Sequence, residues 1–194
     1  TLSYVPRPAF HPFHARKHRW SCLVAHRRAG KTVALINDLV FGGLECQMHR
    51  PQLAYIGPTY SQAKRVAWQY LKDYAEPYLA KGPQEAELKV TLKNEAVIYC
   101  LGSDNADSLR GMYLDGAILD EYALFKPSVF SQVVRPALSD RLGWGCFVST
   151  PRGKNLFYDV CQQGKKDPQD WFTLTLRADE SGIIPATELA ALQK

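Results

Sequence analysis

Three consecutive residues, Gly30, Lys31 and Thr32, have the types and order that end a phosphate-binding loop. In such a loop, backbone N–H groups and the lysine bind the phosphates of a nucleotide, and the Ser/Thr hydroxyl binds Mg²⁺. The triplet alone is weak, because Ala25 stands where the general pattern has its first glycine. Its place between the apolar run 20–25 and an amphipathic helical pattern favours a nucleotide site.

Two arginines, Arg27 and Arg28, lie inside this loop. A guanidinium is a fixed cation whose forked donors suit phosphate oxygens, so one of them could meet the γ-phosphate from within the same subunit. The alternative is that one or both point into solvent, since the geometry cannot direct both at one phosphate. The residues expected to bind the nucleotide are Arg28, Ala29, Gly30, Lys31, Thr32 and Val33.

Two adjacent acids, Asp120 and Glu121, follow the small and apolar run 116–119. A carboxylate at a strand end opposite the phosphate loop is placed to hold Mg²⁺, together with Thr32. Its neighbour can orient or deprotonate an attacking water. The pair therefore predicts hydrolysis rather than phosphoryl transfer to an alcohol. The alternative is a strand that simply ends in solvated acids.

A polar turn, Ser149 to Gly153, follows a further apolar run, 145–148. Ser149 or Thr150 could touch the γ-phosphate or the water and pass the effect of hydrolysis to the next helix. By itself the segment is also typical of an ordinary turn, because proline and glycine punctuate many loops.

The elements that must position these residues alternate along the chain. Apolar runs predict strands at 20–25, 52–56, 116–119, 145–148 and 171–176, and residues 88–100 predict a β-hairpin or two adjacent strands. Helical spacing predicts helices over about 33–44, 60–76, 129–138, 154–163 and from about 186. This order indicates an α/β fold, a mainly parallel sheet with helices on both faces, whose ligands bind at the carboxyl ends of the strands.

Composition bounds the remaining possibilities. The chain has 194 residues, 46% of them hydrophobic, which is enough for one globular domain. No apolar run is long enough to span a bilayer, and residues 1–10 lack the layout of a signal peptide. Five scattered cysteines suggest neither a disulfide framework nor a zinc site, and we expect reduced thiols in a cytosol. The net charge of +5 arises from the N-terminal segment and is compatible with a polyanionic partner or with a solvated basic face.

Taken together, five stretches of the sequence resemble the large terminase subunit of tailed bacteriophages, the DNA-packaging motor. They are VAHRRAGKT (24–32), YIGPTYSQAKRVAW (55–68), SLRG (108–111), GAILDEYA (116–123) and STPRG (149–153). The resemblance runs from about Tyr4 to the C-terminus and implies an ATPase with a P-loop NTPase fold of the ASCE, RecA-like type. Members of the family also tolerate a first residue other than glycine and carry an arginine within the P-loop.

The resemblance implies a role for several residues. Arg27 matches the arginine that acts in cis, Lys31 and Thr32 match the Walker A residues, and Asp120 and Glu121 match the Walker B residues. Thr150 matches the coupling motif. Arg110 stands where the family keeps an arginine near the nucleotide, and it is a candidate to act on a neighbouring subunit.

The resemblance also divides the chain into an N-terminal arm near the adenine site (1–20), the P-loop core (21–178) and the start of a lid or linker (179–194). The family's C-terminal nuclease domain is expected to be absent, which would leave the ATPase half. The glutamine usual in the adenine-contacting region is missing, and Phe10 and His11 lie about where it should be. Adenine could instead stack on Phe10 or Phe13.

The expected function is Mg²⁺-dependent ATP hydrolysis that powers translocation of double-stranded viral DNA into a procapsid. By resemblance the partners are double-stranded DNA, the portal protein and the small terminase subunit, in a homo-oligomeric ring, a pentamer, in the host cytoplasm and without a membrane. The isolated domain could also be a monomer. The alternatives are a non-hydrolysing, nucleotide-dependent assembly subunit and a helicase-like translocase, which would need a second RecA-type domain.

Overall fold

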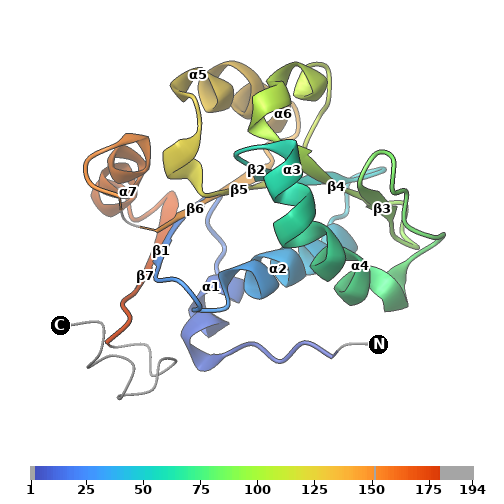
Figure 1. Cartoon of the computed structure of the whole chain (residues 1–194), viewed down its shortest axis with the longest axis horizontal. Coiled ribbons are helices and arrows are strands. Elements are labelled where there is room, and N and C mark those ends of the chain that lie inside the picture. Colours follow the sequence, from blue (N-terminus) through green and yellow to red (C-terminus); the bar gives the residue numbers. More distant parts are fainter. Residues whose placement is uncertain (1–2, 151, 180–194) are drawn as a thin grey trace.

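The computed structural model describes residues 3–150 and 152–179 and is built around one seven-stranded sheet (Figure 1). The strand order is β3-β4-β2-β5-β6-β1-β7. Within the described residues, every neighbouring pair runs parallel except β3 and β4. The strands are β1 Trp20–Ala25, β2 Gln52–Gly57, β3 Lys89–Thr91, β4 Val97–Gly102, β5 Gly116–Asp120, β6 Trp144–Ser149 and β7 Trp171–Leu176. The prediction of a mainly parallel α/β sheet is confirmed.

Helices cover both faces of this sheet (Figure 1). They are α1 His11–His14, α2 Lys31–Glu45, α3 Tyr60–Ala63, α4 Gln69–Ala75, α5 Pro127–Val129, α6 Arg135–Ser139 and α7 Leu156–Lys166. A π-helical turn, Lys64–Trp68, joins α3 to α4 in one continuous helix, and another, Phe130–Val134, joins α5 to α6. None of the described helices is both long and apolar enough to cross a membrane.

The two faces bury separate apolar clusters, and strand alternation decides which residues enter each. One cluster packs α2, α4 and the N-terminal arm against the sheet, and the other packs α5, α6 and α7 against the opposite face. On β5, Ala117 and Leu119 belong to the second cluster and Ile118 to the first. Because side chains alternate along a strand, Asp120 lies on the same face as Ile118, toward α2.

The predicted elements agree with the observed ones to within a few residues. The hairpin expected over 88–100 is the antiparallel pair β3–β4. The short helical turns at Pro8–Phe10 and His11–His14 were not expected, because this segment is basic and aromatic without helical spacing. The helix expected from about residue 186 lies outside the described residues.

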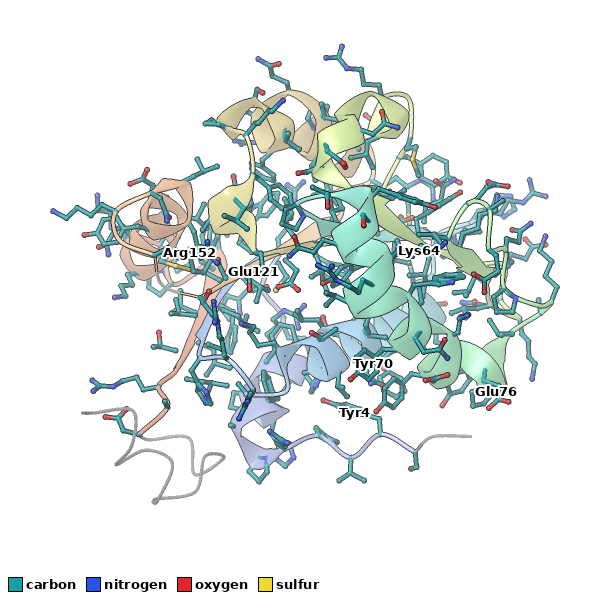
Figure 2. The ribbon with its side chains drawn as sticks, viewed as in Figure 1. Tyr4, Lys64, Tyr70, Glu76, Glu121 and Arg152 are labelled. Atoms are coloured by element: carbon teal, nitrogen blue, oxygen red, sulfur yellow. A yellow bond between two sulfur atoms is a disulfide. The ribbon has the colours of Figure 1, made fainter. Side chains whose placement is uncertain are left out.

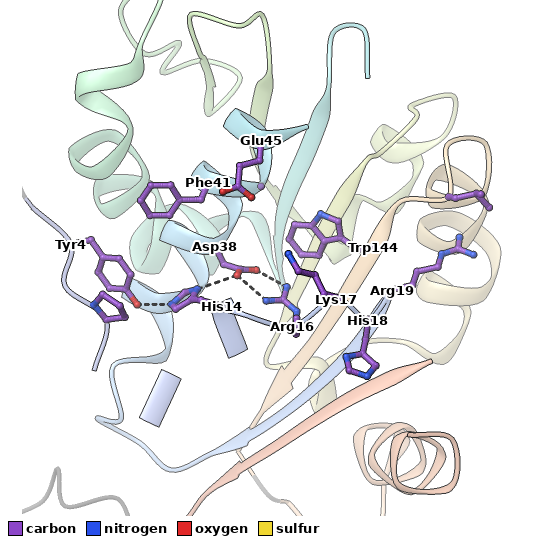
Figure 3. A pocket seen from close by; sticks show the side chains of 13 residues that line it. Tyr4, His14, Arg16, Lys17, His18, Arg19, Asp38, Phe41, Glu45 and Trp144 are labelled. Carbon is purple, nitrogen blue, oxygen red and sulfur yellow. Dashed lines mark hydrogen bonds and ion pairs between the residues drawn. The ribbon is translucent and has the colours of Figure 1, made fainter. Parts of the chain in front are cut away.

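A buried ion pair ties the N-terminal arm to α2 (Figure 3). Arg16 donates to both carboxylate oxygens of Asp38, at 2.8 and 2.6 Å, and both side chains are less than a tenth exposed. His14 donates through Nδ1 to the same carboxylate at 3.2 Å, and its Nε2 is 2.7 Å from the hydroxyl of Tyr4. Arg16 also donates to the carbonyl of Phe13 at 2.7 Å. The arm is therefore anchored to α2 by an ion pair that is largely buried.

The same network lines a cavity of about 670 Å³ against Trp144, the first residue of β6. Trp144 and the second half of α2, from Asp38 to Glu45, place this cavity at the amino ends of the strands. Ligands of parallel sheets bind at the carboxyl ends, so the cavity lies away from the edge where the predicted motifs gather.

The cysteine expectation is wrong for one pair. Cys22 of β1 and Cys161 of α7 are joined as a disulfide, with Cα atoms 5.9 Å apart, within the range for such bonds. A separation of 139 residues hides this proximity in the sequence, and it arises because α7 packs on the face of β1 that carries Cys22. Cys46, Cys100 and Cys146 are free thiols.

The ion pair predicts how stability depends on pH. Burial would raise the pKa of Asp38, but hydrogen bonds from Arg16 and His14 outweigh it and hold that pKa below its usual value. Because the pKa of Asp38 is lower in the folded state than its unfolded value near 3.8, the ionised carboxylate stabilises the fold fully at pH values above 3.8. This stabilisation is lost as the pH falls from 3.8 through the pKa of the folded state. Asp38→Asn should therefore lower the free energy of unfolding by about 3 kcal/mol at pH 7, because it leaves Arg16 buried without its counter-charge.

Urea unfolding at pH 7, 5 and 2.5 checks this expectation, with Glu45→Gln on the exposed end of the same helix as the control. The difference between wild type and Asp38→Asn should be the same at pH 7 and pH 5, which both lie above 3.8, and should be smaller at pH 2.5. A difference as large at pH 2.5 as at pH 7 would contradict the assignment.

Candidate nucleotide site

The three predicted motifs meet at one edge of the sheet. β1, β6 and β5 are consecutive neighbours, all parallel, with Trp20 opposite Gly145 and Leu119 opposite Phe147. Parallel strands in this register end at the same level, so the loop after β1, the tip of β6 and the acids after β5 come together. Each motif was predicted to follow a strand, and the strand order makes the three motifs adjacent.

The phosphate loop turns directly from β1 into α2. Gly30 precedes the helix with φ +89°, a conformation that favours glycine, and Arg28 also has a positive φ of 66°. Lys31 is the first residue of α2, and its Nζ donates to the carbonyl of Ala25 at 3.2 Å. The backbone N–H groups of the first helical turn have no intrahelical partners and face this loop, which is the arrangement that binds a phosphate.

The loop side chains differ in exposure. Arg27 and Arg28 are both exposed, so burial does not single out either as the one that meets a phosphate. Ala29 is buried, whereas Thr32 and Val33 are half-buried in the first turn of α2.

Asp120 is a buried carboxylate, 5% exposed, at the end of β5. Its Oδ2 accepts the hydroxyl of Tyr55 at 2.5 Å and its Oδ1 accepts the backbone N–H of Glu121 at 3.0 Å. Burial raises the pKa of Asp120, and the neighbouring charge of Glu121 adds to the rise, while the hydrogen bond from Tyr55 and the charge of Lys31 oppose it. A nearby cation therefore favours the ionised form.

Glu121 faces the phosphate loop (Figure 2). Its Oε1 lies 4.0 Å from Nζ of Lys31, and its Oε2 accepts the hydroxyls of Ser149 and Thr150, each at 3.4 Å. Its backbone is left-handed, with φ 52°, which is costly for a residue that is not glycine. The turn directs the glutamate away from the strand and toward Lys31 and β6.

The aromatic residues expected to stack on adenine are covered. Phe10 is 1% and Phe13 0% exposed, because both pack into the cluster between the arm and α2. Phe10 still lines a cavity of about 290 Å³, which adjoins Gly30 and Val33. A base could stack on neither ring without displacing the residues that pack against it.

Arg7 is a residue of this region that sequence reasoning missed. Its Nη1 donates to the carbonyl of Ala29 at 3.0 Å, and its guanidinium lies beside Gly30 and lines the same cavity. No local pattern indicated it, because the contact joins residues 22 positions apart. Tyr55 is the first residue of the stretch 55–68, but the sequence indicated no role for it.

Arg110 is not brought to the loop in this chain. It lies in the segment between β4 and β5 and is not among the residues that line the cavity beside Gly30. It lines a different cavity, of about 370 Å³, together with Pro136 of α6 and Asp140, the residue after that helix.

Thr32 and Asp120 offer the hydroxyl and carboxylate oxygens that Mg²⁺ prefers. The charge of Lys31 acts on Asp120, which places the two motifs within electrostatic reach. No cluster of three or more histidine, cysteine or acidic side chains that could hold a metal occurs in the part of the chain that the structure describes. The residues fit a metal that a nucleotide also binds, since Mg²⁺ uses one or two carboxylates and completes its shell with phosphate and water.

Comparisons with known proteins show which family the chain resembles. The chain is 47% identical over 62 residues to the large terminase subunit of Thermus phage G20c, covering 32% of this chain and 13% of that protein. It is 26% identical over 155 residues to the large terminase subunit of Escherichia phage T5, covering 78% of this chain and 34% of that protein. The chain thus spans about a third or less of the length of these curated relatives.

Solved structures show the same fold. The ATPase domain of the large terminase of Thermus phage P74-26 has a TM-score of 0.81 at 24% identity, over 98% of this chain and 87% of that one. The large terminase of a thermophilic bacteriophage in complex with ATP-γ-S has a TM-score of 0.75 at 19% identity, over 95% and 47%. The family model for the N-terminal part of the T4likevirus-type terminase large subunit matches residues 22–181, and the chain belongs to that family.

Proposed function

We propose that this chain is a Mg²⁺-dependent ATPase that powers translocation of double-stranded viral DNA into a procapsid. The observation that carries the proposal is the meeting of Lys31 and Glu121, 4.0 Å apart, with Ser149 and Thr150 on the other oxygen of the glutamate. Hydrolysis of a γ-phosphate requires a cation that binds the phosphate and a carboxylate that activates the water, and both groups lie at this edge of the sheet. Family membership, and the complexes of the thermophilic bacteriophage terminase with ADP and with ATP-γ-S, support ATP as the nucleotide.

The loop binds the phosphates. Backbone N–H groups of residues 29–33 and the positive end of α2 surround the β- and γ-phosphates, and Lys31 exchanges the carbonyl of Ala25 for phosphate oxygens. Arg27 or Arg28, both exposed at the loop, adds charge as the γ-phosphate separates. Mg²⁺, when bound by Thr32 and Asp120, supplies further positive charge beside the phosphate oxygens.

Glu121 activates the water. Its carboxylate accepts a proton from a water whose oxygen attacks the γ-phosphorus, while the bond from that phosphorus to the bridging oxygen breaks and ADP leaves. Ser149 and Thr150 hold the glutamate in place beforehand. Loss of the γ-phosphate would change their contact, and Thr150 lies on the segment between β6 and α7, which gives a route from chemistry to movement.

The adenine base occupies the cavity of about 290 Å³ beside the loop, with the guanidinium of Arg7 as its polar neighbour. A planar guanidinium stacks well on an aromatic face, so Arg7 takes the place of the stacking partner first expected at Phe10. The N-terminal arm thus contributes to nucleotide binding, as its resemblance to the family's adenine region implies.

The wider assembly follows from family membership. We propose a homo-oligomeric ring, pentameric in the family, that acts in the host cytoplasm with the portal protein and the small terminase subunit. Contacts with double-stranded DNA would go mainly to its phosphates, so binding should be sensitive to salt and indifferent to sequence. A non-hydrolysing assembly subunit would not need Glu121 in this position, and a helicase-like translocase is not favoured by the family.

Glu121→Gln should lower the turnover number for ATP by at least ~100-fold while leaving ATP affinity within a few-fold of wild type. The amide keeps the size of the side chain but cannot accept the proton of the attacking water. Phosphate release and ATP binding, measured on the same samples, check the two halves of this expectation.

Glu87→Gln, an exposed carboxylate on the β3 side of the sheet, is the matched control and should retain turnover. Undiminished hydrolysis by the Glu121→Gln protein would show that another group activates the water.

Arg110→Ala should lower turnover on the order of 10³-fold if its guanidinium completes the site of a neighbouring subunit. Wild-type turnover per subunit should then rise with protein concentration. Mixing Arg110→Ala with Lys31→Ala provides the test, because the second variant cannot hydrolyse ATP yet can supply Arg110.

Activity of the mixture above the sum of the two separate proteins supports action between subunits, and Arg135→Ala on the exposed part of α6 serves as control. A mixture as inactive as its components would contradict this role.

A further inference from the structure

The structure connects β2 to the metal side of the site through one side chain, Tyr55. This tyrosine is 2% exposed and lies opposite Ile118 of β5 in the parallel register. Side chains of one face alternate with those of the other, so Tyr55 and Asp120 point to the same face, two residues apart along β5. The phenol spans this offset, and its hydroxyl donates to Oδ2 of Asp120 at 2.5 Å.

The hydrogen bond completes the fixation of the carboxylate. Oδ1 of Asp120 accepts the backbone N–H of Glu121 at 3.0 Å, so both oxygens are held and the plane of the group cannot rotate. An ionised carboxylate has about four acceptor positions, two on each oxygen. Each oxygen of Asp120 therefore keeps a further position for a cation or a water bound to one.

Packing alone does not require this hydroxyl. The ring of Tyr55 lies in the apolar cluster under α2, where phenylalanine would fill the same space without a polar atom to satisfy. A buried hydroxyl costs free energy unless it is paired, and here its partner is the carboxylate that faces the phosphate loop. The hydroxyl of Tyr55 therefore acts on the site through Asp120.

We propose that Tyr55 is a positioning residue for the metal site: its hydroxyl holds Asp120 in the orientation that binds the divalent cation of the nucleotide complex. The inference rests on the proposed function, because it presupposes that Asp120 meets a metal-bound nucleotide. It extends the site to a fourth strand, since β2 contributes no residue to the three motifs at the ends of β1, β6 and β5.

Tyr55→Phe tests the role with a readout other than turnover. Binding of Mn²⁺ to the protein·ADP complex is followed by the electron paramagnetic resonance signal of free Mn²⁺, and binding of ADP without metal is followed by calorimetry in EDTA. The variant should raise the Kd for Mn²⁺ about 10-fold, as loss of a ligand's hydrogen-bond partner does elsewhere, and should leave the Kd for metal-free ADP within twofold. Tyr99→Phe, which removes a hydroxyl from the adjacent strand β4, is the matched control and should change neither value.

A double-mutant cycle with Asp120→Ala separates positioning from a general effect on the fold. Once the side chain of Asp120 is removed, Tyr55→Phe should alter the Kd for Mn²⁺ by less than twofold, because the hydroxyl has no ligand left to hold. The same factor in both backgrounds would overturn the proposal, and so would an equal loss of metal-free ADP affinity or a Tyr55→Phe protein that does not fold.

Measurements on the wild-type protein distinguish a failure of the proposed function from a failure of the role of Tyr55. A wild-type protein that binds no ADP in EDTA and none with Mn²⁺ overturns the proposed function and this inference with it. A wild-type protein that binds Mn²⁺·ADP, beside a Tyr55→Phe variant with the same Kd for Mn²⁺, overturns the inference alone.

Discussion

The site depends on one constraint, that β1, β6 and β5 end at the same level. The register of the parallel strands is fixed, because a shift of one residue would move the side chains of a strand to the opposite face of the sheet. Lys31, Thr150 and Glu121 lie far apart along the chain, and each lies between one and six residues beyond the end of its strand. The hydrogen-bonded register of the strands therefore brings these residues together, and the site forms only when the sheet forms.

Helix α2 carries this constraint to the rest of the domain. Its first residue is Lys31, and its middle is held to the N-terminal arm by the buried pair of Asp38 and Arg16. Breaking such a pair would leave a largely buried charge without its partner, so the pair holds the arm to the helix. The arm in turn brings Arg7 to the carbonyl of Ala29. One ion pair thus couples the phosphate loop to the N-terminal arm.

Most of the fold could be predicted because its strands and helices have clear periodicity. The apolar run of β5 is buried at all five positions, and α2 follows a helical pattern from the phosphate loop. The polar residues after each strand were predicted as a site because ligands of parallel sheets bind there. Tyr55 and Arg7 were missed, since a buried tyrosine suits a core and an arginine of a basic arm suits solvent. The burial of Phe10 was missed for the same reason, because an aromatic residue fits a core as well as a base.

The sequence by itself determined most of the elements and indicated the family, because both depend on short patterns of apolar spacing and residue type. Only the tertiary structure decided which strands are neighbours, that Tyr55 donates to Asp120, that Cys22 meets Cys161, and that Arg110 lines a cavity beside α6. These are contacts between distant segments. The free energy of these contacts comes from packing and hydrogen bonding between residues that are far apart in the sequence. A short stretch of sequence therefore does not reveal them, because many residue types fit the pattern of a strand or helix and only a few make the contact.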